Sequence, residues 1–175
     1  MSEACLCGDV PVVRARTEIV IVRHVLEAWK TTNTARIAAL ALPNARIVDY
    51  GGADSAFDAE ALAVEGSWLL FPGAPHRPEG VPDRVVVLDG SWAQAKRMCQ
   101  RIGALRRLPR WSIAPPSVPR RRLREAPTPD ALSTLEAIAS ALGEIEGVEI
   151  GDALFGLHDL MVRRILTARG AMAVD

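Results

Sequence analysis

Short runs of aliphatic and β-branched residues alternate with amphipathic segments along the chain. The apolar runs within residues 18–23 (E-I-V-I-V-R) and 84–88 (R-V-V-V-L) are typical of strands buried on both faces of a parallel sheet. Shorter runs predict strands over residues 45–49 and 67–71, and residues 111–114 favour a last, short strand. Glycines and prolines after these runs, at residues 51–52 and 72–73, mark turns.

Helical segments are expected between the strands. Possible N-cap oxygens at residues 31–34 precede a helix over residues 35–42, residues 58–65 form a weak helix, and a longer helix covers residues 91–105. Two helices end the chain, over residues 133–146, opened by the capping-box spacing S-T-L-E, and over residues 152–168. Residues 115–129 are too proline-rich for helix or central strand and favour an ordered, extended loop. The alternation predicts an α/β fold with a mostly parallel sheet and flanking helices.

Length and composition indicate one folded domain over residues 1–175, with a frayed tail at residues 170–175. Hydrophobic residues at 49% and charged residues at 24% exclude a disordered chain. No uncharged apolar run approaches the roughly 20 residues that cross a bilayer, and Glu3 stands where a signal peptide would be positive. Three cysteines, with Cys5 and Cys7 too close for an easy bridge, disfavour a disulfide framework. We therefore expect a cytoplasmic protein without a membrane segment.

The net charge of zero hides a strong segregation of charge. Ten of the 21 basic residues lie between Ser91 and Arg124 and no acidic residue lies among them, so this block carries +10 and the rest of the chain −10. The block is either a solvated basic helix with an arginine-rich loop or a surface that contacts a phosphate backbone. We favour the second interpretation, because ten like charges repel one another and a polyanion relieves that repulsion. Its members are Lys96, Arg97, Arg101, Arg106, Arg107, Arg110, Arg120, Arg121, Arg122 and Arg124.

The common catalytic motifs are absent from the sequence. It contains no P-loop lysine motif, no G-x-G-x-x-G, no H-E-x-x-H and no G-x-S-x-G. The histidines, His24, His76 and His158, are scattered and are expected to be structural. Cys5 and Cys7 need two further ligands to close a zinc site, and Cys99 lies within a predicted helix, so we expect no metal.

Asp89-Gly90-Ser91-Trp92 is the segment where position and chemistry agree. It follows the strongest central strand and opens a helix, which is where open α/β sheets bind ligands. The alternative is structural: Asp89 ends the strand, Ser91 caps the helix and Trp92 fills the core. The residues alone leave both interpretations open.

The run V-V-L-D-G-S-W-A-Q-A-K-R-M at residues 86–98 resembles the signature of DTW-domain proteins, named for an Asp, Thr, Trp pattern at this place. Three more segments resemble family motifs in the same order: T-N-T-A-R at residues 32–36, L-F-P-G at residues 70–73 and L-S-T-L-E-A at residues 132–137. The resemblance implies a tRNA-uridine aminocarboxypropyltransferase, which moves the 3-amino-3-carboxypropyl group from S-adenosylmethionine to N3 of a uridine in tRNA. It also implies a SPOUT-like α/β fold with a knotted C-terminal half.

The chain departs from the family pattern at three places. Ser91 replaces the usual threonine and keeps its hydroxyl. Residues 24–27 (H-V-L-E) lack the proline of the family's histidine-proline-x-glutamate stretch, so the first loop is expected to differ in shape. Residues 1–16 hold only C-L-C of a four-cysteine pattern, whose first pair normally lies upstream, and this supports the expectation that no zinc is bound.

The resemblance assigns catalysis to Asp89, Ser91 and Trp92. Uridine N3 belongs to a weakly acidic imide, so its alkylation needs the proton removed, and a carboxylate is a natural group for that step. A free aspartate has a pKa of about 3.9, a poor match, so either burial raises the pKa of Asp89 or this residue only orients the base. Both roles remain open at this stage.

Donor and RNA contacts are expected from loops and from the basic block. The donor-binding residues are Phe71, Pro72, Gly73, Leu88, Ser133, Thr134 and Leu135, while Glu136 has the alternative of acting only as a capping residue. Arg36 binds the donor carboxylate or a phosphate, or is an ordinary exposed helix arginine. The RNA-binding residues are Arg36, Lys96, Arg97, Arg120, Arg121 and Arg122. The resemblance implies tRNA as partner and no protein partner; the alternative functions are an S-adenosylmethionine-dependent RNA methyltransferase and a non-catalytic RNA-binding domain.

Overall fold

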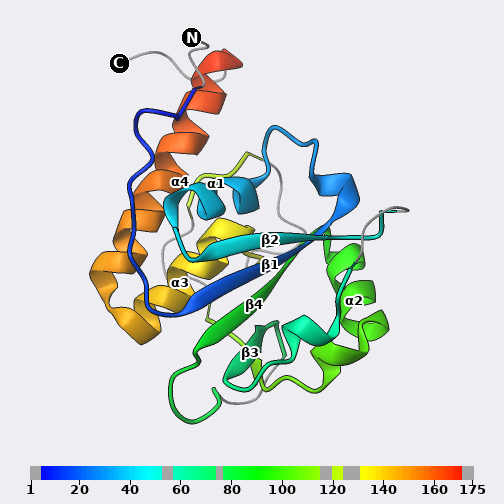
Figure 1. Ribbon diagram of the computed structural model, residues 1–175. Helices are drawn as coiled ribbons and strands as arrows, with labels where there is room; N and C mark the ends of the chain where they lie inside the picture. Colours follow the sequence, from blue (N-terminus) through cyan, green and yellow to red (C-terminus); the bar gives the residue numbers. More distant parts are fainter. Residues whose placement is uncertain (1–4, 53–56, 74–76, 115–119, 124–130, 171–175) are drawn as a thin grey trace.

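Five parallel strands form the centre of the computed structural model, which describes residues 5–52, 57–73, 77–114, 120–123 and 131–170 (Figure 1). The strand order is β2-β1-β4-β3-β5. The strands are β1 (Glu18–His24), β2 (Ala45–Tyr50), β3 (Ser67–Leu70), β4 (Arg84–Asp89) and β5 (Arg110–Trp111). Every neighbouring pair runs parallel, which confirms the predicted α/β fold with a parallel sheet. The SPOUT-like relationship and the knot stay predictions.

Helices cover both faces of the sheet. The helices α1 (Thr34–Ala41), α3 (Thr134–Glu146) and α4 (Val148–Ala168) lie on one face, and α2 (Trp92–Arg101) lies on the other (Figure 1). Side chains of β1 alternate between the faces: Ile19 and Ile21 pack with α1 and α3, while Val20 and Val22 pack with α2. Burial on both faces is the reason why this strand is apolar almost throughout.

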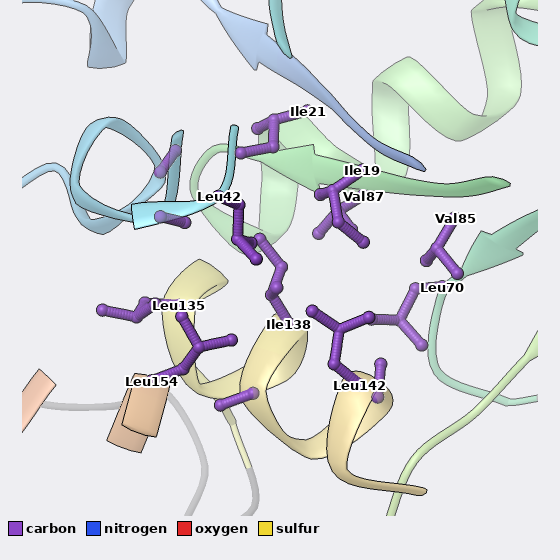
Figure 2. Close-up of a cluster of buried hydrophobic side chains, with 14 of the residues drawn as sticks. Ile19, Ile21, Leu42, Leu70, Val85, Val87, Leu135, Ile138, Leu142 and Leu154 are labelled. Carbon is purple, nitrogen blue, oxygen red and sulfur yellow. The ribbon is translucent and has the colours of Figure 1, made fainter. Parts of the chain in front are cut away.

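The larger of the two hydrophobic clusters lies between the sheet and α3. Figure 2 shows Leu135, Ile138 and Leu142 of α3 facing the aliphatic side chains of the central strands. Leu154 of α4 packs on the outer side of α3, so α4 forms a further layer that reaches the sheet mainly through α3. The packing fixes the N-terminus of α3 beside the ends of β1 and β4, where the candidate site lies.

Several predicted boundaries are wrong. The helix expected over residues 91–105 ends at Arg101, because Ile102 takes an extended conformation and the 3₁₀ turn η3 (Gly103–Arg106) follows. The weak helix expected over residues 58–65 is only the 3₁₀ turn η2 (Glu60–Leu62). The last strand is Arg110–Trp111, so residues 112–114 are not strand. The helix over residues 133–146 is confirmed with its capping box.

The last helix starts earlier than the expected residue 152. Gly147, with a φ of 124°, separates α3 from α4, and α4 begins at once at Val148. Gly151 lies inside the helix, where a Cβ atom would come within 3.0 Å of the Ala139 carbonyl oxygen and 3.1 Å of Gly143 Cα. This glycine therefore permits the close crossing of α4 over α3 and does not mark a helix end.

Some expectations fall on residues outside the described ranges: His76, Arg124, the prolines within residues 115–119 and 127–129, and the tail from residue 171. Within the described ranges, no helix is both long and apolar enough to cross a membrane. The 3₁₀ turn η1 (Val25–Glu27) leads from β1 towards α1, and it borders the site described next.

Candidate active site

Asp89 is the last residue of β4, at the centre of the sheet, and its side chain is buried with 6% exposed. Both carboxylate oxygens accept hydrogen bonds from neutral side chains. Asn33 Nδ2 donates to Asp89 Oδ2 at 2.7 Å, and Thr134 Oγ1 donates to Asp89 Oδ1 at 2.6 Å. These two donors hold the carboxylate in one orientation and leave each oxygen with a lone pair for a further donor.

The N-termini of α1 and α3 meet on this carboxylate. Asn33 is the N-cap of α1: its Oδ1 accepts from Arg36 N at 2.9 Å while its amide nitrogen donates to Asp89. Thr134 is the first residue of α3, and the backbone N–H of the next residue, Leu135, donates to Thr34 Oγ1 at 3.4 Å. Three segments far apart in the sequence thus converge at the end of one strand.

The surroundings raise the pKa of Asp89. Burial is the largest cause, because it disfavours the charged form, and the nearby Glu27 carboxylate acts in the same direction. The hydrogen bonds from Thr134 and Asn33, together with the charge of Arg23, lower the pKa but do not outweigh burial. Asp89 therefore holds a proton more readily than an exposed aspartate does.

Two cavities adjoin this end of the sheet. The smaller, of about 150 Å³, is mostly apolar, and its lining includes Leu70, Phe71, Val87, Trp111 and Ile113. The larger, of about 630 Å³, is a cleft whose polar lining includes Glu27, Thr32, Asp89, Arg122 and His158. Gly90, Trp92, Leu132, Ser133 and Thr134 line both cavities. A ligand with an apolar part and a polar part would fit across this shared wall.

One side of the cleft holds a buried polar cluster around Glu136, whose side chain is fully buried. Its Oε2 accepts the N–H of Ser133 at 2.8 Å, which completes the capping box of α3. Its Oε1 lies 3.6 Å from Arg122 Nε, too far for a hydrogen bond, and neither atom has another hydrogen-bond partner. His158, also buried, has its Nε2 3.9 Å from Glu136 Oε2. Arg122 and Glu136 thus form an ion pair without a hydrogen bond, which leaves both atoms able to bind a further polar group beside the cleft.

Ser91 and Trp92, the other two predicted catalytic residues, lie beside Asp89 at the start of α2. Ser91 is the N-cap: its Oγ accepts from Gln94 N at 3.3 Å, and Gln94 Oε1 accepts from Ser91 N at 2.6 Å. Trp92 is 43% exposed and lines both cavities, so it is not core filler. Ser91 lines the larger cleft.

Five of the seven predicted donor-binding residues line a cavity. Phe71, Pro72 and Leu88 line the apolar cavity, while Ser133 and Thr134 line both. Leu135 instead points into the core, and Gly73 is exposed and borders neither cavity. The predicted residues are therefore brought to one place except for these two.

The predicted RNA-binding residues fall into two groups. Arg36, Lys96 and Arg97 are exposed on α1 and α2. The second group is the arginine run at residues 120–122, in which Arg121 is exposed and its two neighbours are partly buried. Arg122 borders the cleft, whereas Arg120 forms an ion pair with Asp159 and lies 4.1 Å above the Phe155 ring.

Sequence reasoning missed several residues of the site. Asn33 was considered only as a source of N-cap oxygens, Glu27 only as part of a loop motif, and His158 only as a structural histidine. The local signal for Asn33 is its amide, which has both an acceptor for the helix and a donor for a neighbour. No local signal indicates that Glu27 and His158 line one cleft, because they lie on opposite ends of the chain.

The arrangement is that of a parallel α/β protein with a candidate ligand site beyond the carboxyl ends of its strands. The chain belongs to the DTW domain family, which it matches over residues 1–166. No solved structure matches it.

The relatives are longer proteins. The chain is 31% identical over 160 residues to tRNA-uridine aminocarboxypropyltransferase 2 of Mus musculus, which covers 82% of this chain and 53% of the relative. It is 28% identical over 156 residues to tRNA-uridine aminocarboxypropyltransferase 2 of Drosophila melanogaster, covering 81% of this chain and 62% of the relative. For the protein of the same name in Macaca fascicularis the identity is 28%, with 82% and 53% covered. The chain thus spans about half to three fifths of the length of these relatives.

Proposed function

We propose that this protein transfers the 3-amino-3-carboxypropyl group of S-adenosylmethionine to N3 of a uridine in tRNA. The observation that carries the proposal is the buried Asp89 carboxylate, which lines the larger cleft next to Gly90, a residue that borders both cavities. Family membership and the names of the relatives support the same reaction. Free thiols at Cys5, Cys7 and Cys99 fit a reducing compartment, and we propose the cytoplasm.

The two cavities suit the two parts of the donor. Phe71, Leu88 and Trp111 would hold the adenosine part in the apolar cavity. Arg122 would bind the donor's carboxylate in the cleft, and Glu27 is placed to attract its ammonium group. Arg122 lies inside the cleft beside a buried carboxylate, which favours this role over an RNA phosphate. When bound, the donor supplies an electrophilic carbon next to a sulfonium. The deprotonated N3 would bond to this carbon as the carbon–sulfur bond breaks, which leaves 5′-methylthioadenosine as the second product.

Asp89 would take the proton from uridine N3. A base is effective when its pKa approaches the working pH, so the raised pKa of Asp89 improves its match to a weakly acidic imide. Asn33 and Thr134 hold the carboxylate in place, so little reorientation is needed as the proton moves. Trp92, at the wall shared by both cavities, would pack beside the reacting groups and exclude water.

Mass spectrometry of tRNA nucleosides from cells with and without the gene tests this proposal. Loss of a carboxypropyl-uridine supports it. Loss of a methylated nucleoside would instead identify an S-adenosylmethionine-dependent RNA methyltransferase, since the methyl carbon on the sulfonium is electrophilic as well as the carboxypropyl carbon. No change in any nucleoside would contradict both and favour a non-catalytic RNA-binding domain.

A further inference from the structure

Trp29 is the most exposed large hydrophobic side chain among the described residues, at 88%. Tryptophan usually buries most of its surface, so a nearly bare indole on a folded surface is unusual. Leu26, three residues earlier, is also exposed, at 64%. Because both side chains are exposed, the hydrophobic core does not require them to be apolar. Trp29 also lies outside the proposed catalytic machinery.

The segment that carries Trp29 is held by consecutive turns. The backbone hydrogen bonds run from Ala28 N to Val25 O, from Lys30 N to Glu27 O and from Asn33 N to Lys30 O. Glu27 also pairs with Lys30, with Nζ 2.5 Å from Oε1. The segment ends in Asn33, whose amide donates to Asp89. The Trp29 backbone is thus ordered before any partner binds, which lowers the entropic cost of using its side chain in recognition.

The segment that carries Trp29 borders the cleft. Glu27 and Thr32, on either side of Trp29 in the sequence, line the cleft, whereas Trp29 itself does not. Figure 1 shows the short blue helix after β1 at the same end of the sheet as the start of α2. Trp92, which opens α2, lines the cleft from there. The exposed indole therefore projects from a segment that borders the cleft.

The charge around this cleft favours a nucleic acid as the partner. Arg36 is exposed on α1, and Lys96 and Arg97 are exposed on α2, whereas Lys30, which follows Trp29, is paired with Glu27. The acid-free block that includes α2 carries +10. A cationic surface with an exposed indole combines the two features that bind unpaired nucleotides, which are phosphate attraction and base stacking.

We propose that Trp29 is a stacking platform for a nucleotide that flanks the target uridine, which rests on the proposed function. N3 lies on the Watson–Crick edge, so the target base must leave its pairing partner or be unpaired before it enters the cleft. A base that leaves the stack exposes the π face of its neighbour. The exposed indole replaces that lost stacking contact and holds the RNA open at the cleft.

Binding of an unmodified tRNA transcript to Trp29→Ala and Trp29→Phe at several salt concentrations tests this role. Stacking on one base corresponds to a Kd about 5- to 150-fold higher for Trp29→Ala, while Trp29→Phe retains most of the affinity. The log–log salt slope stays unchanged, because stacking releases no phosphate counterions. Quenching of tryptophan fluorescence by the transcript is smaller in Trp29→Phe than in the wild type.

Val148→Ala is the matched control, because Val148 is an exposed apolar residue at the start of α4, outside both cavities. It should bind the transcript as the wild type does, and all variants should bind S-adenosylmethionine equally. A wild-type Kd for Trp29→Ala would overturn the proposal. A changed salt slope would also overturn it. A variant that loses self-association but still binds tRNA would overturn it too, because that result would assign Trp29 to a protein interface.

The binding assay requires no turnover, so the two proposals fail separately. A protein that binds tRNA through Trp29 and yet makes no carboxypropyl-uridine contradicts the proposed reaction only. A protein that makes this product while Trp29→Ala binds tRNA normally contradicts the stacking role only.

Discussion

Glu18 opens β1 at one end of the sheet, and Asp89 closes the neighbouring strand β4 at the other. Glu18 is bracketed by two guanidinium groups, with Arg46 Nε 2.9 Å and Arg84 Nε 2.6 Å from its carboxylate oxygens. Partial burial opposes ionisation of Glu18, but the hydrogen bonds from both arginines outweigh it, so its pKa lies below the ordinary value. At this end of the sheet, both oxygens of the carboxylate bind arginines of the neighbouring strands, which is a structural role.

At the other end the same functional group has neutral partners and more burial. Asp89 accepts from an amide and a hydroxyl, and its pKa lies above the ordinary value, with burial as the largest cause. The guanidinium nearest in the sheet, Arg23, is instead paired with Asp49, with Nε 2.7 Å from Oδ1. The comparison shows that one parallel sheet holds one carboxylate in its charged form between guanidinium groups and buries another among neutral partners, where it takes up a proton more readily. The second environment suits the proposed proton transfer.

The largest expected effect is a loss of the rate of carboxypropyl transfer in the Asp89→Asn variant. The asparagine can keep both contacts, since its oxygen accepts from Asn33 Nδ2 and its amide donates to Thr134 Oγ1, so fold and donor binding should survive. Loss of the base should slow transfer about 10²- to 10⁴-fold in single-turnover assays on a tRNA transcript. Glu18→Gln, the matched change at the other end of the sheet, should transfer at the wild-type rate. Wild-type transfer by Asp89→Asn would make Asp89 structural and refute the mechanism.

The sequence predicts the centre of this site well and its completion poorly. The local pattern of a buried β-branched strand followed by Asp-Gly places Asp89 at a candidate ligand site, and only the resemblance to DTW-domain proteins gives it a catalytic role. Asn33 and Thr134 are 56 and 45 residues away from it. Their convergence depends on β1 lying beside β4 and on α3 packing across both, and neither fact is written in any local pattern.

In the fold, too, features set by local patterns were predicted and features set by tertiary contacts were not. Strands were predicted within one or two residues at most ends, because burial on both faces leaves an uninterrupted apolar run. Helix ends were wrong where a tertiary contact overrides local preference. The last helix was expected from residue 152, yet it begins at Val148 and includes Gly151, where α3 approaches too closely for a side chain. The strand order itself required the structure.

A second prediction concerns Arg121, the exposed member of the arginine run. Because its side chain is more exposed than those of its two neighbours, we expect Arg121 to make the phosphate contact of this run. Arg121→Ala should flatten the log–log salt slope of tRNA binding by about 0.7 to 0.9. Arg14→Ala, at an exposed arginine before β1, should leave the slope unchanged. Identical slopes for Arg121→Ala and wild type would show that this side chain does not touch RNA.

A third prediction is that Asp89→Asn raises the free energy of unfolding at neutral pH. The folded-state pKa of Asp89 is raised above its usual value near 3.8, so the wild type loses stability as pH rises from that value through the folded-state pKa. The asparagine does not titrate. The difference in free energy of unfolding between the variant and the wild type should therefore grow as pH rises from the usual pKa to the folded-state pKa, and stay constant at higher pH. Denaturant unfolding between pH 3 and pH 8 measures it. A variant that is less stable at pH 7 would show that the carboxylate charge itself stabilises the fold.

The smallest expected effect is on the stability of Glu18→Gln, at the other end of the sheet, and its sign is opposite to that expected for Asp89→Asn. The folded-state pKa of Glu18 is lowered below its usual value near 4.5, so its contribution to stability is present above that value and is lost as pH falls through the folded-state pKa. Glu18→Gln should therefore lower the free energy of unfolding at pH 7, by less than about 1 kcal/mol because the pair is partly exposed. The deficit should shrink in acid and in high salt, whereas the effect of Asp89→Asn should be nearly insensitive to salt, since burial causes it. If Asp89→Asn and Glu18→Gln changed the free energy of unfolding in the same direction at neutral pH, the contrast between the two ends of the sheet would be contradicted.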